Sequence, residues 1–153
     1  KDKIVISGMT KRIEAYYSKK PLALGVGVYA IFDYGGLNPY FLLGILNSKF
    51  LTNYFREEFK HKHLAGGYLA INKSTIEQLP IVKPNKIVEE QLATLAKQEM
   101  SLNNEFNKSV ENSDQWQKLK DEIAKTAQKI DKEVYKLYGL TEEEVAVVEG
   151  KEK

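Results

Sequence analysis

Basic side chains gather at three places in the first half of the sequence. Lys11-Arg12 and Lys19-Lys20 sit at predicted turns, and a third run covers residues 60–63. Ammonium, guanidinium and imidazole groups donate hydrogen bonds to phosphate oxygens and base edges, and Arg suits a bidentate contact with guanine. The lysines suit phosphates, and tyrosines interleave the first two places. The candidate residues for contact with duplex DNA are Lys11, Arg12, Tyr16, Lys19, Lys20, Lys60, His61, Lys62 and His63.

Other chemistries fit these residues less well. His61 and His63 would suit a metal ion if a strand aligned them, but Glu57 and Glu58 are the nearest carboxylates. Solvated polar loops are the alternative interpretation of the basic places. Asn38-Pro39-Tyr40 is similar to the Asn-Pro-Pro-Tyr motif of amino-methyltransferases without its second Pro, and it is interpreted as a helix start. We expect no catalytic, cofactor-binding or metal-binding residues in this chain.

Charge and composition divide the 153 residues into two parts. Residues 1–85 hold 12 Lys and Arg against 6 Asp and Glu, a net charge of +6. Residues 86–153 hold 11 against 15, a net charge of −4, and contain no Pro. Pro80 and Pro84 mark the boundary. We therefore predict a recognition domain over 1–85 and a helical hairpin with a short last helix over 86–153.

The first part alternates strand and helix signals. A turn is predicted over residues 8–11, and Asn38-Pro39 opens a helix whose apolar positions recur over about twenty residues. Ser74 and Glu77 have the spacing of a capping box, and the short helix that follows stops at Pro80. β-branched and aromatic runs predict extended segments at Lys3–Ser7, Arg12–Tyr17, residues 22–34 and Tyr68–Ile71.

The second part carries two apolar seams at heptad-like spacing, joined by the polar turn Asn112-Ser113-Asp114. This pattern predicts an antiparallel helical hairpin. Gly139 ends the second helix, and Thr141 with Glu144 forms a capping box for a short last helix. The predicted seams are Val88, Leu92, Leu95, Leu102, Phe106 and Val110, facing Trp116, Leu119, Ile123, Ala127, Ile130, Val134 and Leu137.

The elements together define an α+β chain: a small mixed β-sheet domain with packed helices, followed by a long antiparallel hairpin. The sequence has no Cys, which suits a reducing compartment, so we expect a cytoplasmic location. No apolar run is long enough to span a membrane. The chain begins at Lys1 without an initiator Met, and we expect it to be a fragment of a longer protein.

Three pieces of sequence carry a family resemblance. They are Leu43-Gly44-Ile45-Leu46-Asn47-Ser48-Lys49, the Gly66-Gly67 pair with the following Ile71-Asn72-Lys73, and Leu79-Pro80-Ile81. They resemble the TaqI-like C-terminal specificity domain, the target-recognition domain of adenine-N6 DNA methyltransferases and fused type II restriction-modification enzymes. They are also similar to target-recognition domains of type I specificity subunits. The tail over residues 130–144 resembles the usual ending of these proteins.

The resemblance implies sequence-specific recognition of double-stranded DNA. An upstream methyltransferase domain of the same polypeptide, outside this chain, would hold S-adenosylmethionine and receive the target adenine. The parent protein would then be a site-specific adenine-N6 DNA methyltransferase, with or without a fused endonuclease. The alternative from the residues is a protein-interaction module that pairs through the hairpin, including self-association. A free-standing enzyme is the weakest hypothesis.

Overall fold

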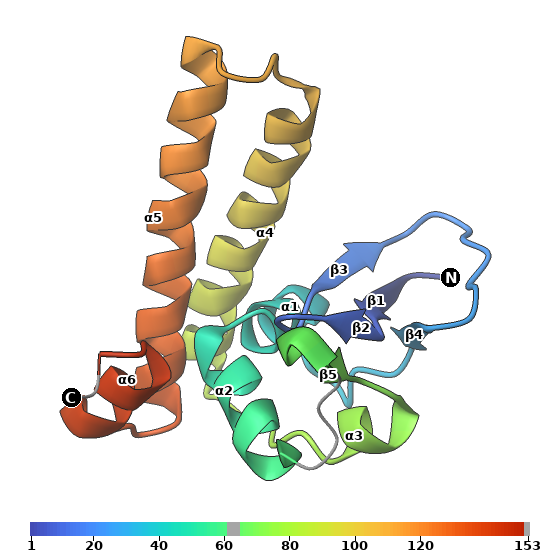
Figure 1. Ribbon diagram of the computed structural model, residues 1–153, viewed down its shortest axis with the longest axis vertical. Coiled ribbons are helices and arrows are strands. Elements are labelled where there is room, and N and C mark those ends of the chain that lie inside the picture. Colours follow the sequence, from blue (N-terminus) through green and yellow to red (C-terminus); the bar gives the residue numbers. More distant parts are fainter. Residues whose placement is uncertain (61–64, 152–153) are drawn as a thin grey trace.

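The computed structural model describes residues 1–60 and 65–151. It combines two small antiparallel sheets with packed helices and one long helix pair, which confirms the predicted α+β class (Figure 1). In Figure 1 the helix pair runs along one side of the molecule, and the sheets project from its lower half.

A three-stranded sheet holds the N-terminal region together. Its strand order is β3-β1-β4, so β1 lies in the middle and pairs antiparallel with both neighbours. Because side chains alternate along a strand, Ile4 and Ile6 of β1 enter the core, while Val5 shares the other face with Tyr16. The strands are β1 (Lys3–Ser7), β3 (Ala15–Ser18) and β4 (Val28–Ile31).

A second, two-stranded sheet joins β2 (Met9–Thr10) to β5 (Leu69–Ala70). The strand predictions at Lys3–Ser7 and near residue 69 are confirmed. The turn predicted over residues 8–11 is wrong in part, because Met9 and Thr10 pair with β5. The other two extended segments were predicted too long, since residues 12–14, 22–27 and 32–34 lie outside strands.

The predicted twenty-residue helix is two helices, α1 (Pro39–Leu46) and α2 (Lys49–Glu58). Asn38 caps α1 as predicted. The break comes at Asn47-Ser48, where the Ser48 hydroxyl accepts from the Leu51 N–H and caps α2. A short 3-10 turn (Ala65–Gly67) precedes β5.

Helix α3 (Lys73–Glu77) begins two residues earlier than the predicted capping box requires. Asn72 is the N-cap, and its side chain accepts from the Thr75 N–H while Thr75 accepts from the Asn72 N–H. The predicted Ser74–Glu77 box is therefore wrong. Asn is as good a cap as Ser, and the pair that begins at Asn72 occupies the helix start.

The predicted hairpin is confirmed as α4 (Lys86–Lys108) and α5 (Asp114–Leu137), followed by α6 (Glu142–Val148). Ser113 caps α5, and the Thr141–Glu144 box caps α6 as predicted. Val110 does not belong to the seam: it lies past the end of α4 and is 76% exposed. No helix of the described residues is long and apolar enough to cross a membrane.

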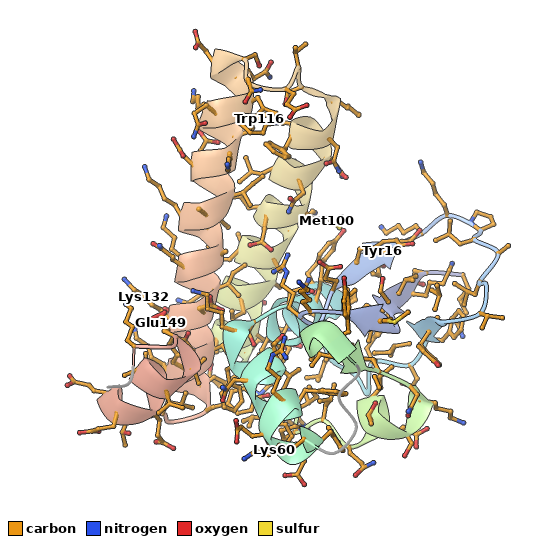
Figure 2. All side chains as sticks on the ribbon, in the orientation of Figure 1. Tyr16, Lys60, Met100, Trp116, Lys132 and Glu149 are labelled. Carbon is orange, nitrogen blue, oxygen red and sulfur yellow. The ribbon has the colours of Figure 1, made fainter. Side chains whose placement is uncertain are left out.

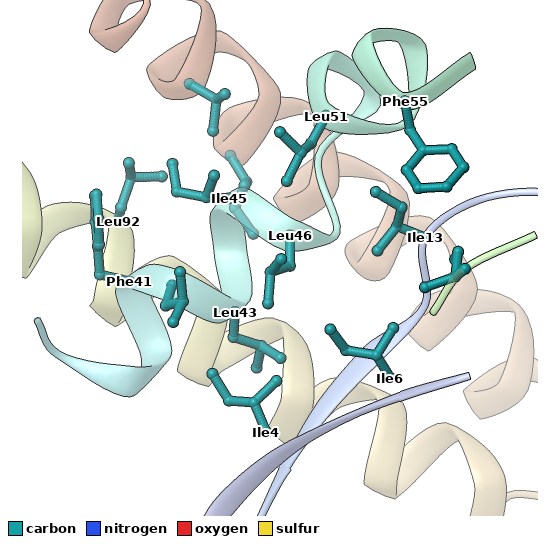
Figure 3. Packing of buried hydrophobic residues seen from close by; sticks show 14 of the residues in the cluster. Ile4, Ile6, Ile13, Phe41, Leu43, Ile45, Leu46, Leu51, Phe55 and Leu92 are labelled. Carbon is teal, nitrogen blue, oxygen red and sulfur yellow. The ribbon is translucent and has the colours of Figure 1, made fainter. Parts of the chain in front are cut away.

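One buried cluster joins the sheet, α1, α2 and the lower hairpin. Figure 3 shows Phe41, Leu43 and Ile45 of α1 between the sheet residue Ile4 and Leu92 of α4. Ile130 and Val134 of α5 belong to the same cluster. The core therefore crosses residue 85, so the lower hairpin is packed onto the sheet region, whereas its upper half extends beyond it (Figure 1).

Candidate nucleic-acid interface

A groove lies between the exposed edge of β3 and the hairpin. It consists of three adjoining hollows that share Arg12 and Asn47, and the largest has a volume of about 490 Å³. Figure 2 shows Tyr16 on the sheet side and Met100 on the α4 side of this largest hollow. We call the lining of the three hollows the Arg12 groove.

Amide side chains dominate the polar lining of the largest hollow. Asn103, Asn104 and Asn107 of α4 face Asn47 at the end of α1. Asn forms bidentate contacts with adenine and Arg does so with guanine, so this lining has the chemistry of base reading. The ring of Tyr16, about half exposed, adds a flat apolar surface beside Arg12. Of the predicted residues, Arg12 and Tyr16 are thus brought together here.

The Arg12 turn is held by side chains of the helices rather than by strand pairing. The Asn47 Oδ1 accepts from the Ala15 N–H at 2.8 Å, and its Nδ2 donates to the Ala15 carbonyl oxygen at 2.9 Å. The Thr52 hydroxyl accepts from the Ile13 N–H at 3.0 Å. These three bonds satisfy backbone groups of Ile13 and of Ala15 on the free edge of β3, and they fix the direction from which Arg12 enters the groove.

Arg56 of α2 adds a third tie. Its guanidinium donates to the Lys11 carbonyl oxygen and, at 3.1 Å, to the Gly67 carbonyl oxygen. The Lys11 ammonium lies 5.5 Å from the centre of the Tyr68 ring. The turn that carries Lys11 and Arg12 is therefore joined to the loop that precedes β5.

The groove has a mixed electrostatic field. The Arg12 guanidinium lies 3.7 Å from the Glu14 carboxylate, an exposed pair. Burial raises the pKa of Glu99, and Arg12 partly opposes that shift. Burial also raises the pKa of Asp131, opposed by the hydrogen bond from the Lys49 backbone. Glu14, Glu99 and Asp131 thus all interact electrostatically with Arg12.

Two acidic side chains of the hairpin hold the helices that carry the groove. The Glu89 carboxylate of α4 accepts from the Asn38 N–H at 2.7 Å, at the start of α1. The Asp131 carboxylate of α5 accepts from the Lys49 N–H at 3.0 Å, at the start of α2. A carboxylate is stabilised at a helix N-terminus by the helix dipole and free N–H groups. Both acids are buried, so these joints fix helices α1 and α2 on the hairpin.

The sheet has its own anchor at Asp2. The Tyr17 and Tyr34 hydroxyls both donate to the Asp2 carboxylate, at 2.9 and 3.2 Å. Burial and the nearby Asp2 raise the pKa of each phenol to about 12. These bonds tie the N-terminal residues to β3 and to the segment after β4.

The remaining predicted residues lie elsewhere. Lys19 and Lys20 are exposed at the far end of β3, where the β3–β4 loop begins. Lys60 follows α2, pairs with Glu57 at 3.1 Å and lies far from Tyr16 in Figure 2. His61, Lys62 and His63 fall outside the described residues.

Several groove residues were missed by the sequence prediction. Asn103, Asn104 and Asn107 were not selected, because the selection followed charged residues at predicted loops. Asn is a poor residue for a helix interior, and three of them at spacings of one and three residues on α4 are a usable signal of a polar binding face. Asn47 gives no local signal, since its partner Ala15 lies 32 residues away.

The fold and this groove define a mixed α+β module that presents basic and amide side chains on one open face. A family model for the TaqI-like C-terminal specificity domain matches residues 1–81, more than half of the chain, so the chain belongs to this family. None of the curated proteins matches the chain significantly. Membership of this family supports a role in DNA sequence recognition in restriction-modification enzymes. The family is one of specificity domains rather than catalytic domains.

Proposed function

We propose that the chain reads a short duplex DNA sequence through its sheet region and the Arg12 groove, as the specificity domain of a DNA methyltransferase. The observation that carries the proposal is the position of Arg12 and Tyr16 beside four Asn side chains on one face of a domain of this family. Residues 1–85 supply most of the readout. The hairpin, residues 86–153, supplies the opposite wall of the groove and serves as a spacer or docking element.

The roles follow from chemistry and placement. Arg12 contacts guanine, the α4 amides of Asn103, Asn104 and Asn107 contact adenine edges, and Tyr16 packs against a base or sugar. Lys11, Lys19, Lys20 and Lys60 contact phosphates, which supply affinity rather than sequence information. His61, Lys62 and His63 keep the phosphate and base-edge role predicted from their sequence.

The parent protein supplies the chemistry. An upstream methyltransferase domain of the same polypeptide would bind S-adenosylmethionine and transfer a methyl group to the N6 of the adenine that this domain presents. The support for this part is the family description, which names a C-terminal specificity domain.

The test is selection of binding sites from a randomised duplex pool by residues 1–153, at low and at moderate salt. An enriched motif of a few base pairs is expected. If about five phosphates are contacted, the slope of log K against log salt is about −4 to −5. Binding that is independent of salt, or no binding at low salt, would contradict the proposal.

Arg12→Lys separates base reading from charge. Lys keeps the positive charge but loses the planar fork, so the preference for guanine at one position should fall about tenfold while the salt slope is kept. Lys118→Gln is the matched control, because Lys118 is exposed on the hairpin outside the groove lining. Equal effects of the two variants would remove Arg12 from the readout.

The hairpin also favours a second candidate function, pairing with another protein or a second copy. Ile87 of α4 is 70% exposed and forms one face with Thr94 and Leu95. Sedimentation of the chain at high concentration tests self-association. A mass that stays monomeric would leave the seams to intramolecular packing.

A further inference from the structure

The β3–β4 loop projects from the sheet at the end away from the hairpin (Figure 1). We call residues 19–27 the finger. The finger leaves β3 at Ser18 and returns to β4 at Val28. Every residue of the finger is exposed, yet it is fixed at both of its ends.

The first end is held by a buried lysine. Lys3 of β1 is 4% exposed, and its ammonium donates to the Lys20 carbonyl oxygen at 2.9 Å and to the Lys1 carbonyl oxygen at 3.1 Å. A charge buried to this extent is stabilised by such bonds, so it holds the base of the finger firmly.

The second end is held by a close backbone approach. The Gly8 N–H donates to the Gly27 carbonyl oxygen at 2.8 Å. A Cβ atom at position 8 would lie 2.7 Å from that oxygen, so this contact requires Gly. Gly27 itself has a φ of 82°, a conformation that Gly adopts readily.

Between these anchors the finger carries apolar side chains in water. Leu22 and Leu24 are each 41% exposed, and Val26 is fully exposed. They alternate along the chain with the small residues Ala23 and Gly25. Apolar side chains placed together on an anchored projection indicate a surface that is covered when a ligand binds.

The charge around the finger identifies the ligand. Residues 15–32 contain Lys19 and Lys20 but no Asp or Glu. The Lys1 ammonium, 5.9 Å from the centre of the Phe32 ring, adds a cation beside the same end of the sheet. The finger thus has positive charges where it leaves the sheet and apolar side chains at its tip. This arrangement matches duplex DNA, whose phosphates flank grooves lined by base edges and thymine methyl groups.

The length of the finger also fits. Its nine residues reach at most about 30 Å when fully extended, and they join Ser18, opposite Lys3, to Val28, opposite Ser7. Those two positions of β1 are about 13 Å apart along the strand, so the loop has enough chain to bow outward by the depth of the DNA major groove, about 8.5 Å. Apolar wedges formed by Leu or Pro are known to insert between base steps.

We propose that the finger enters a DNA groove, where Leu22, Leu24 and Val26 contact the apolar parts of bases while Lys19 and Lys20 bind the flanking phosphates. This inference rests on the proposed DNA recognition and adds a second contact, at the opposite end of β3 from Arg12.

The test measures binding of the 153-residue chain to the duplex enriched from the pool, with the triple variant Leu22→Ser, Leu24→Ser and Val26→Ser. Affinity should fall about tenfold or more, because the apolar contacts are lost, while the salt slope stays unchanged because no phosphate contact is removed. The matched control is Ile87→Ser, Val110→Ser and Val147→Ser, three exposed apolar residues of the helical region, which should leave affinity unchanged. Circular dichroism checks that both variants fold.

Two further experiments identify the contact between the finger and DNA. Lys19→Gln with Lys20→Gln should make the salt slope shallower by about 2. Replacing thymine by uracil in the duplex should weaken wild-type binding if the tip contacts methyl groups, and 2-aminopurine fluorescence should rise if it unstacks a base step.

The outcomes separate the two proposals. If the wild-type chain binds no duplex, DNA recognition itself is wrong, and this inference falls with it. If the wild type binds and the tip variant binds equally well, the finger lies outside the DNA interface and this inference alone is overturned.

Discussion

The two segments that flank β3 are built in opposite ways. The turn before it, which carries Arg12, is bound by Asn47, Thr52 and Arg56 from the helices. The finger after it is held at its base by Lys3 and Gly8, and its side chains face water. Changes near the turn therefore alter stability and binding together, whereas changes in the finger tip affect binding alone.

The largest effect that tests this comparison is expected from Asn47→Ala. The substitution removes both hydrogen bonds to Ala15 and leaves the edge of β3 unsatisfied, so the free energy of unfolding should fall by about 2–3 kcal/mol. Urea unfolding measures it. Asn103→Ala is the control, because Asn103 is exposed on α4 and Ala is the better helix former, so stability should hold or rise slightly. Similar losses in the two variants would show that the turn is not held as described.

The finger base should respond less strongly. Gly8→Ala places a Cβ atom against the Gly27 carbonyl oxygen at 2.7 Å, and we expect a loss of about 1–2 kcal/mol in unfolding free energy. Gly25→Ala is the matched change in the tip, where a Cβ atom would meet nothing within 4 Å, and it should be neutral. Thermal unfolding of the two variants distinguishes them. A neutral Gly8→Ala would mean that this end of the finger is free to move.

The anchor at Asp2 predicts a pH dependence. The pKa values of Tyr17 and Tyr34 are raised to about 12 from an ordinary value of 10, so the folded state binds these protons more tightly than the unfolded state. This stabilisation is complete below pH 10 and is lost as pH rises towards 12. Unfolding free energy measured across this range should fall.

Two variants in β3 test whether the Asp2 anchor causes this loss of stability at high pH. Tyr17→Phe should flatten the decline between pH 10 and 12, because one of the two coupled phenols is gone. Tyr16→Phe, on the other face of the same strand, should leave the decline as in the wild type. The reverse pattern would place the titration outside the Asp2 anchor.

The smallest expected effect concerns the acid in the Arg12 groove. Glu99→Gln removes a negative charge that faces Arg12, so affinity for DNA should rise about threefold at low salt and less at high salt. Glu105→Gln, exposed on α4 outside the groove lining, is the control and should change affinity less. Equal gains would indicate a general charge effect rather than a groove.

Local patterns were enough to predict the regular elements. The heptad-like spacing gives α4 and α5, and Asn38, Ser113 and Thr141 mark helix starts because each can accept from a free backbone N–H. The break between α1 and α2 was missed because the apolar spacing continues through it. The sequence signal for the break is Ser48, a residue type that caps helices, and Ser48 does cap α2.

Contacts between residues far apart in the chain could not be predicted from the sequence. The β2–β5 pairing joins two-residue strands that lie about sixty residues apart, too short for a periodic signal. Arg12 and Tyr16 were selected from charge and aromatic character, but their amide neighbours come from α1 and α4 and meet them only in the folded chain. The groove therefore depends on packing that no local pattern encodes.

The joints made by Glu89 and Asp131 have a consequence for how new specificities arise. Each carboxylate accepts from a backbone N–H at a helix start, at Asn38 and at Lys49, so the joint does not depend on the side chains at those two positions. The hairpin can therefore bind any segment whose backbone N–H groups lie at these two places. Recognition regions with different turns and fingers could be exchanged on one hairpin, and a chimaera that keeps both acids should fold and inherit the target sequence of its donor.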